Sequence, residues 1–178
     1  MFFLVFLLAP GTCFAEEITV ELVWKFPEPG WLELEVRQGV YELKYNQSTL
    51  RLKAEDSFKI GQSGLTAFLA TDKGLEILDK PLLRISAQDK GIFRLREPGK
   101  DWVSYRGNLA VSKEGTVWKL ANTLDREDYL KGVVPIEMSN SWAAKGFEAL
   151  KAQAVAARTY LLKNADASGR ITDSPDIH

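Results

Sequence analysis

A change in the period of the hydrophobic pattern near Asn122 constrains the fold of this chain more than any other feature. Before Asn122, short stretches rich in β-branched and aromatic residues are separated by turn residues, which is typical of antiparallel strands. After Asn122, apolar residues recur at the three- and four-residue spacing of helices. The pattern predicts an α+β protein in which an antiparallel β-rich N-terminal part packs on a C-terminal helical segment.

A series of short stretches in the N-terminal part are candidate strands. Alternation is clearest in Trp31–Val36, where Leu32, Leu34 and Val36 share the face that we expect to be buried. Gly61–Gly64 lacks the Gly-Lys-Ser/Thr ending of a phosphate-binding loop and is interpreted as a turn. The candidate strands are Ile18–Trp24, Trp31–Val36, Tyr41–Tyr45, Leu50–Lys53, Leu65–Ala70, Leu75–Leu78, Leu82–Ile85, Ile92–Leu95, Asn108–Val111 and Thr116–Leu120.

A first helix is expected just after the β-rich part. Asp125 is its predicted N-cap, with Asp128 at the third helical position. Gly132 and Pro135 are expected to end this helix, because glycine and proline are the residues least favourable inside one. The segment Val133–Met138 would then be a tight apolar connection that carries one carboxylate.

A second helix is expected over Phe147–Lys163, which contains no glycine or proline. Its apolar stripe consists of Phe147, Leu150, Ala154, Ala157 and Leu161. The small alanine side chains would allow another element to approach the helix backbone closely.

Residues 1–15 have the layout of a signal peptide. An apolar run from Phe2 to Ala9 is followed by small residues up to Ala15. The run is shorter than the roughly 20 apolar residues that span a bilayer, so we expect cleavage after Ala15 and an extracytoplasmic location, whether secreted, periplasmic or cell-wall associated. The single cysteine, Cys13, lies in this segment, so no disulfide or Cys-based zinc site is expected in the mature chain.

The overall charge argues against a polyanion as the main partner. The 23 Lys and Arg residues are balanced by 24 Asp and Glu residues, which gives a formal net charge of −1. Such a chain has no general basic field to hold nucleic acid. No nucleic-acid partner and no cofactor are therefore predicted.

Two motifs in the helical part carry a family resemblance. Tyr129–Met138 reads Tyr-Leu-Lys-Gly-Val-Val-Pro-Ile-Glu-Met, and Glu148–Tyr160 reads Glu-Ala-Leu-Lys-Ala-Gln-Ala-Val-Ala-Ala-Arg-Thr-Tyr. Together they closely resemble the SpoIID/LytB family, which includes stage II sporulation protein D and the amidase enhancer LytB. The resemblance covers about 102–176, and the family continues with further motifs. It therefore implies that 102–178 is the N-terminal half of a SpoIID/LytB-type domain that is incomplete at its C-terminus. The predicted division of the chain is a signal peptide at 1–15, a β-rich region at 16–101 and this domain half at 102–178.

The resemblance implies lytic transglycosylase-like cleavage of peptidoglycan glycan strands, with Glu137 as the catalytic acid and base. Chemistry supports this role, because one carboxyl can protonate the leaving oxygen and then accept the proton of the sugar hydroxyl that closes an anhydro ring. The apolar residues around Glu137 in the sequence are expected to disfavour its charged form, as a general acid requires. The alternative is that Glu137 only caps or salt-bridges the following segment.

Further candidates for substrate binding lie on or near the second helix. Lys151 and Arg158 are seven residues apart and share a face, so they can form a cationic wall that holds Glu137 or polar groups of the substrate. Gln153 is a weaker candidate. The alternative is a solvated helix face with a Glu148–Lys151 ion pair.

Three aromatic residues are further candidates for sugar binding, and the chain differs from the family pattern at one place. Trp142, Trp102 and Tyr105 can stack on sugar rings, although core packing is the more common fate of such side chains. His178 is the only histidine, and no metal site is predicted. Between the two motifs this chain is about one helical turn longer than the family pattern, with the extra residues placed at Ala143–Gly146.

The sequence therefore leaves three functional hypotheses. The first is a peptidoglycan lytic transglycosylase. The second is a non-catalytic wall-binding protein that recruits or stimulates an amidase, and the third is an inactive fragment. The predicted partners are peptidoglycan glycan strands and a cell-wall amidase or another wall hydrolase.

Overall fold

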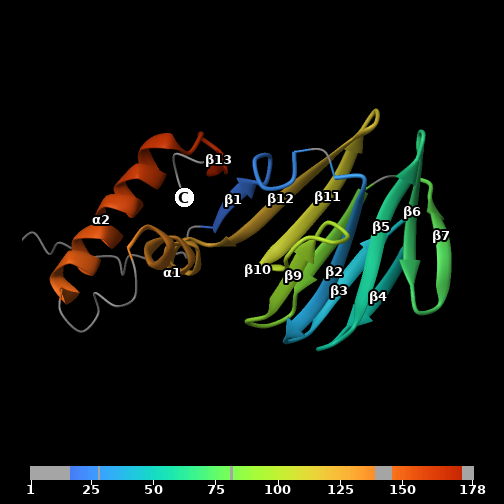
Figure 1. Ribbon diagram of the computed structural model, residues 1–178, viewed down its shortest axis with the longest axis horizontal. Helices are drawn as coiled ribbons and strands as arrows, with labels where there is room; N and C mark the ends of the chain where they lie inside the picture. The colour runs from blue at the N-terminus through green and yellow to red at the C-terminus, as the bar shows by residue number, and fades with distance from the viewer. Residues whose placement is uncertain (1–16, 28, 81, 139–145, 174–178) are drawn as a thin grey trace, which may run out of the picture.

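The computed structural model describes residues 17–27, 29–80, 82–138 and 146–173, which form two β-sheets and two helices (Figure 1). The signal peptide predicted at 1–15, Trp142 and the extra turn proposed before Gly146 lie outside the described residues. The elements are β1 (Glu17–Glu21), β2 (Trp31–Gln38), β3 (Tyr41–Tyr45), β4 (Ser48–Leu52), β5 (Ser57–Ser63), β6 (Thr66–Thr71), β7 (Gly74–Leu78), β8 (Leu82–Ala87), β9 (Ile92–Arg96), β10 (Val103–Arg106), β11 (Asn108–Glu114), β12 (Val117–Asp125), α1 (Arg126–Glu137), α2 (Phe147–Asn164) and β13 (Arg170–Thr172).

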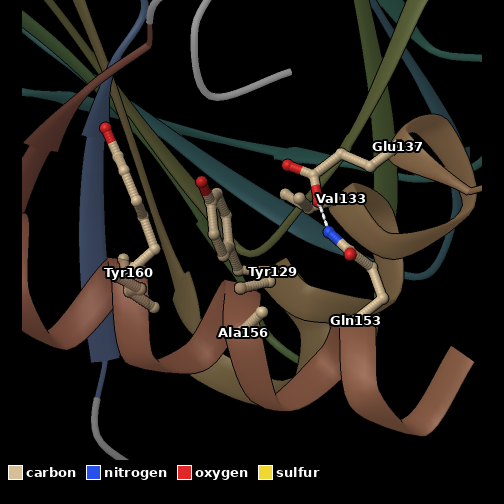
Figure 2. Close-up of a pocket in the computed structure, with 8 residues that line it drawn as sticks. Tyr129, Val133, Glu137, Gln153, Ala156 and Tyr160 are labelled. Atoms are coloured by element: carbon tan, nitrogen blue, oxygen red, sulfur yellow. Dashed lines mark hydrogen bonds between the residues drawn. The ribbon is translucent and has the colours of Figure 1, made fainter. Parts of the chain in front are cut away.

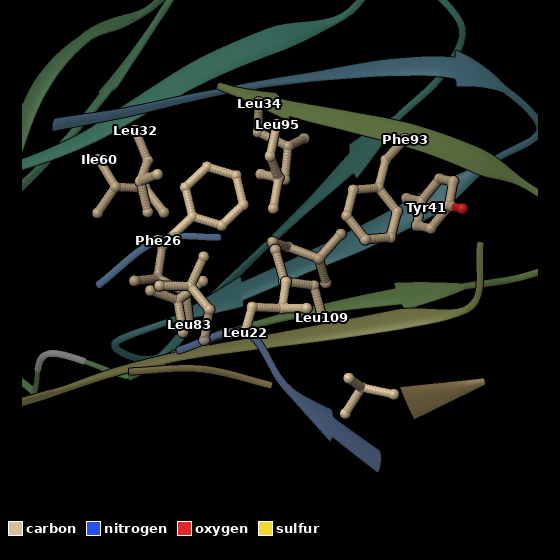
Figure 3. Packing of buried hydrophobic residues seen from close by; sticks show 14 of the residues in the cluster. Leu22, Phe26, Leu32, Leu34, Tyr41, Ile60, Leu83, Phe93, Leu95 and Leu109 are labelled. Atoms are coloured by element: carbon tan, nitrogen blue, oxygen red, sulfur yellow. The ribbon is translucent and has the colours of Figure 1, made fainter. Parts of the chain in front are cut away.

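The two sheets face each other and enclose the main core. One sheet has the strand order β13-β1-β12-β11-β8-β3-β4 and the other β10-β9-β2-β5-β6-β7. Figure 3 shows Leu32, Leu34 and Leu95 of one sheet opposite Leu83 and Leu109 of the other. Both helices lie at one end of this β-rich part, so the predicted α+β fold is confirmed (Figure 1).

Alternation predicted the inner face of β2 correctly. Leu32, Leu34 and Val36 are fully buried, whereas Glu33 and Glu35 on the opposite face form ion pairs with arginines of β9. The pairing follows from the register, since Glu33 lies opposite Arg96 and Glu35 opposite Arg94.

The interpretation of Gly61–Gly64 as a turn is confirmed only for Gly64, which lies in the turn between β5 and β6 with a φ of +58°, and it is wrong for Gly61, because residues up to Ser63 belong to β5. A Cβ on Gly61 would overlap the indole ring of Trp31, which lies directly opposite it on β2. Glycine here permits a close cross-strand contact within a strand rather than a chain reversal. Strands β5, β10 and β13 were not among the predicted strands.

The start of α1 agrees with the sequence prediction. The side chain of Asp125 accepts hydrogen bonds from the backbone N–H groups of Glu127, at 2.8 Å, and of Asp128, at 3.2 Å. This satisfies two donors that the helix geometry leaves without an intrahelical partner.

The predicted end of α1 is wrong, because the helix continues through Gly132 and Pro135 to Glu137. Leu130 and Val133 are buried against the core, and this packing outweighs the low helix propensity of glycine and proline. The consequence for the site is that Glu137 is carried on a helical turn and not on a connecting loop.

Helix α2 confirms the second predicted helix, but it is buried along only part of its length. Leu161 is its one buried side chain among the described residues, and Ala157 packs against the core while partly exposed. Phe147 is exposed, so the predicted stripe is buried mainly towards its C-terminal end. Neither helix in the described part of the chain is long and apolar enough to cross a membrane.

The short strand β13 returns the chain to the first sheet. It pairs in parallel with β1 and brings Asp173 beside the turn that follows β1. The boundary proposed at residue 102 falls between β9 and β10, and the sheet that contains β1 has strands from both sides of it. The division into domains stays a prediction.

The Gly132→Ala variant should be more stable than the wild type by about 0.5–1 kcal/mol, because alanine loses less backbone entropy than glycine in a helix. A Cβ at Gly132 meets no atom within 4 Å, so no clash offsets this gain. Chemical denaturation measures the difference. The control is Gly107→Ala, which should be destabilising because Gly107 has a φ of +75° and its Cβ would overlap the carbonyl oxygen of Thr123. An unchanged midpoint for Gly132→Ala would contradict a helical conformation at Gly132.

Candidate functional site

A cavity of about 180 Å³ lies between α1 and α2 and contains the carboxylate of Glu137 (Figure 2). Tyr129, Val133 and Glu137 are four residues apart along α1 and therefore share the face that lines it. The residues contributed by α2 are Gln153, Ala156, Ala157, Tyr160 and Leu161. We call this the Glu137 pocket.

Gln153 is the side chain that holds Glu137. Its Nε2 donates a hydrogen bond to Oε2 of the Glu137 carboxylate, from one helix to the other (Figure 2). The structure thus brings the weakest of the predicted substrate-binding candidates into direct contact with the predicted catalytic residue. The bond fixes one carboxylate oxygen and leaves Oε1 available to a ligand.

The expectation that apolar neighbours desolvate Glu137 is wrong for this structure, because Glu137 is exposed. Consecutive residues of a helix point about 100° apart, so Ile136 and Pro135 lie on different faces from Glu137. Ile136 itself is 69% exposed. The apolar run in the sequence is therefore spread around the helix rather than gathered at the carboxylate.

Two tyrosines that sequence reasoning did not single out also line the Glu137 pocket. Figure 2 shows the hydroxyl groups of Tyr129 and Tyr160 on the same side of α2 as the Glu137 carboxylate. Burial, with a smaller contribution from the negative charge of Glu137, raises the pKa of Tyr129 to about 12. The Tyr129 hydroxyl therefore stays protonated at neutral pH and can donate a hydrogen bond. Both residues belong to the two motifs, which was the signal that could have found them.

Lys151 and Arg158 do not hold the carboxylate of Glu137. Lys151 pairs with Glu148 at 2.9 Å, which was the alternative interpretation, and Arg158 pairs with Glu127 of α1 at 2.7 Å. Helical spacing explains this, because Gln153 points into the pocket and Lys151 and Arg158 are not in its four-residue row. A substrate-binding role for Lys151 and Arg158 stays a prediction.

The candidate stacking aromatics of the β-rich part are already in contact with protein groups. The Tyr105 ring is stacked on Phe93 with 5.7 Å between the ring centroids, and it packs against the core. The guanidinium groups of Arg94 and Arg96 lie 4.4 and 4.3 Å from the centroid of the Trp102 ring. Core packing is the better description of Tyr105, and Trp102 is covered by cations.

No group of three or more His, Cys, Asp or Glu side chains among the described residues is placed to hold a metal ion. The polar groups that the described residues contribute to the Glu137 pocket are a carboxylate, an amide and two phenols. Such groups can bind and protonate a polar, uncharged ligand such as a sugar.

The fold and this pocket define an α+β protein in which Glu137 is the one carboxylate that the described residues of the two C-terminal helices present to the pocket between them. Residues 114–177 match the model of the SpoIID family, described as stage II sporulation protein, which supports assigning this part of the chain to the SpoIID/LytB family. The match includes α1, α2 and every residue of the Glu137 pocket. At family level it supports a function related to sporulation or the cell wall.

Comparison with individual proteins gives less information about function. An uncharacterized protein of Brachyspira hyodysenteriae is 48% identical over 68 residues, which is 36% of this chain and 18% of that protein. The chain thus aligns with less than a fifth of this relative's length. No solved structure matches the chain.

Proposed function

We propose that the protein is exported and cleaves peptidoglycan glycan strands as a lytic transglycosylase, with Glu137 as its acid and base. The observation that carries the proposal is the single carboxylate of the family segment opening into a cavity between two helices, with one oxygen hydrogen-bonded to Gln153. Export rests on the signal-peptide pattern of residues 1–15, and N-terminal sequencing of protein recovered outside the cytoplasm should find Glu16 as the first residue.

The number of carboxylates favours transglycosylation over hydrolysis. Ordinary glycoside hydrolases need two carboxyl groups, about 5–9.5 Å apart depending on the stereochemistry. Glu137 is the only acidic residue among those that line the pocket in the described part of the chain. A reaction that uses one carboxyl twice fits this arrangement better than one that needs a pair.

The proposed reaction balances with Glu137 alone. Protonated Glu137 donates its proton to the glycosidic oxygen while the bond from that oxygen to the sugar C1 breaks and its electron pair leaves with the oxygen. A hydroxyl of the same sugar then attacks C1 and gives its proton to the carboxylate. The sugar ends as an anhydro ring, the carboxyl is regenerated, and no water is consumed.

The neighbours of Glu137 have distinct tasks in this scheme. Gln153 orients the carboxylate through Oε2, so the transferred proton resides on Oε1. The ring of Tyr129 forms part of the pocket wall on the same side and bounds the space in which the sugar would bind (Figure 2). Such preorganised contacts keep the reacting groups within the short distances that the reaction needs.

One observation keeps a non-catalytic wall-binding amidase enhancer as a second candidate. Glu137 is exposed, and its carboxylate is already engaged by the side-chain amide of Gln153. A protein that only binds glycan strands and recruits an amidase does not need a protonated carboxyl.

Product analysis separates these two functions. Purified glycan strands incubated with the protein should release fragments that end in anhydro sugars, detectable by mass because each is one water lighter than a hydrolysis product. Reducing ends instead would identify a hydrolase and contradict the proposed reaction. If the protein released no sugar fragments but increased the rate at which an added wall amidase cleaves peptidoglycan, it would be identified as an amidase enhancer.

A further inference from the structure

A second, larger cavity of about 470 Å³ lies between α1 and the ends of the strands next to it. Its lining includes the exposed cationic side chains of Lys25, Arg106 and Lys131, and we call it the basic groove. Asp128, Gly132 and Ile136 line it from α1. Each of these residues is four positions from the next, so the three share a face of α1. This face is next to the one that lines the Glu137 pocket.

The basic groove and the Glu137 pocket lie on adjacent faces of α1. Tyr129 and Val133 line both cavities, so the two cavities are neighbours. The Glu137 pocket alone is smaller than the roughly 300–1,000 Å³ of typical ligand sites, whereas the groove lies within that range. A polymeric substrate therefore has room for a second unit in the groove.

The carboxylates of the basic groove are already satisfied by protein donors. Asp173 is buried and accepts hydrogen bonds from the backbone N–H groups of Trp24, at 2.7 Å, and Lys25, at 3.1 Å. Asp128 pairs with Lys131 at 2.7 Å, and this contact, helped by the nearby charge of Arg106, lowers the pKa of the Asp128 carboxyl.

Two further cations of the groove are not paired in this way. Lys25 and Arg106 bond to Asp173 and Asn122 through their backbone groups, and within the described part of the chain neither side chain makes a hydrogen bond or ion pair, although the charge of Arg106 acts on the nearby Asp128. With Asp128 and Asp173 occupied, these cations give the groove a preference for an anionic group. The exposed indole of Trp24, also in the lining, offers a flat apolar face that suits a sugar ring.

We propose that the basic groove binds a carboxylate-bearing sugar of the glycan strand next to the sugar at Glu137, with Arg106 and Lys25 contacting its lactyl carboxylate. The lactyl group is attached directly to the sugar ring, so a ring placed against Trp24 carries its carboxylate into the groove that both cations line. This carboxylate is free only on a sugar without a peptide stem, because a stem is joined to it through an amide bond. This inference rests on the proposed function, because it takes peptidoglycan glycan as the ligand.

Binding measurements with two probes test the inference. The Glu137→Gln protein, in which turnover is prevented, is titrated with peptide-free glycan strands and with chito-oligosaccharides of the same length, whose sugars carry no lactyl carboxylate. We expect tighter binding of the glycan strands. Adding Arg106→Gln should weaken that binding about tenfold, the effect of losing one charge-assisted hydrogen bond, and leave chito-oligosaccharide binding unchanged. Lys25→Gln should act in the same direction.

The matched control is Lys73→Gln, which removes an equal charge from an exposed position in the turn between β6 and β7, away from α1 (Figure 1). It should alter neither affinity. Equal weakening for both probes, or no weakening by Arg106→Gln, would overturn the groove assignment while leaving the proposed function in place. Failure of the Glu137→Gln protein to bind either probe would overturn both. Circular dichroism of each variant verifies that the fold is retained.

Discussion

Glu137→Gln should lower the rate of anhydro-sugar release from glycan strands by roughly 10²- to 10⁴-fold, the usual contribution of a general acid and base. Glutamine keeps the size of the side chain and can still accept a hydrogen bond from Gln153 through its amide oxygen. It cannot lose and regain the proton that the reaction transfers. Because Glu137 is exposed, the substitution should change the free energy of unfolding by no more than about 0.5 kcal/mol.

The control for this loss is Glu114→Gln, which makes the same chemical change on an exposed residue of β11 that pairs with Lys119. Glu114 does not line the Glu137 pocket, so its variant should keep wild-type activity. Equal release of anhydro sugars by the Glu137→Gln protein and the wild type would remove Glu137 from the mechanism. The similarity of residues 114–177 to the SpoIID family would survive that result, whereas the proposed reaction would not.

Local periodicity predicted the elements whose neighbours follow directly along the chain. The alternation in β2 and the three- and four-residue spacing in α2 each state which side chains point inward, and the burial of Leu34 and Leu161 agrees. The cap at Asp125 was also predictable, because its hydrogen bonds join residues two and three positions apart.

Elements that depend on distant partners were not predictable in this way. Gly61 is read as a turn by propensity, but its conformation is decided by Trp31 on the opposite strand. Pro135 is read as a helix end, but the buried residues of the preceding turns keep α1 in place. Strand β13 contains three residues and pairs with the first described strand, β1, so no local sequence pattern predicts it.

The same distinction applies to the candidate site. The motifs supplied Glu137 and Gln153, and the helical spacing that joins Gln153 to Leu161 places its side chain on the packed face of α2. The basic groove combines Lys25, Arg106 and Asp173, which are far apart in the sequence. They meet through the pairing of β1 with β12 and β13 and through the hydrogen bond that Asn122 of β12 donates to the Arg106 carbonyl oxygen. A single sequence contains no signal for such a meeting.

Leu161→Ala should lower the free energy of unfolding by about 2–5 kcal/mol, because it leaves a cavity under the only side chain that α2 buries among the described residues. The effect falls on the site as well as on the fold. Gln153, Ala157 and Leu161 are four residues apart, so the packing of Leu161 fixes the rotation of α2 that points Gln153 at Glu137.

Leu162→Ala is the matched control, since it removes the same atoms from the neighbouring residue, which is 56% exposed. Its effect should stay within about 0.5 kcal/mol. Chemical denaturation of both variants beside the wild type therefore measures which face of α2 is turned inward. If Leu162→Ala proved the more destabilising of the two, the helix would be rotated by about 100° from the orientation described here. Gln153 would then point away from Glu137, and the arrangement on which the proposed reaction rests would be lost with it.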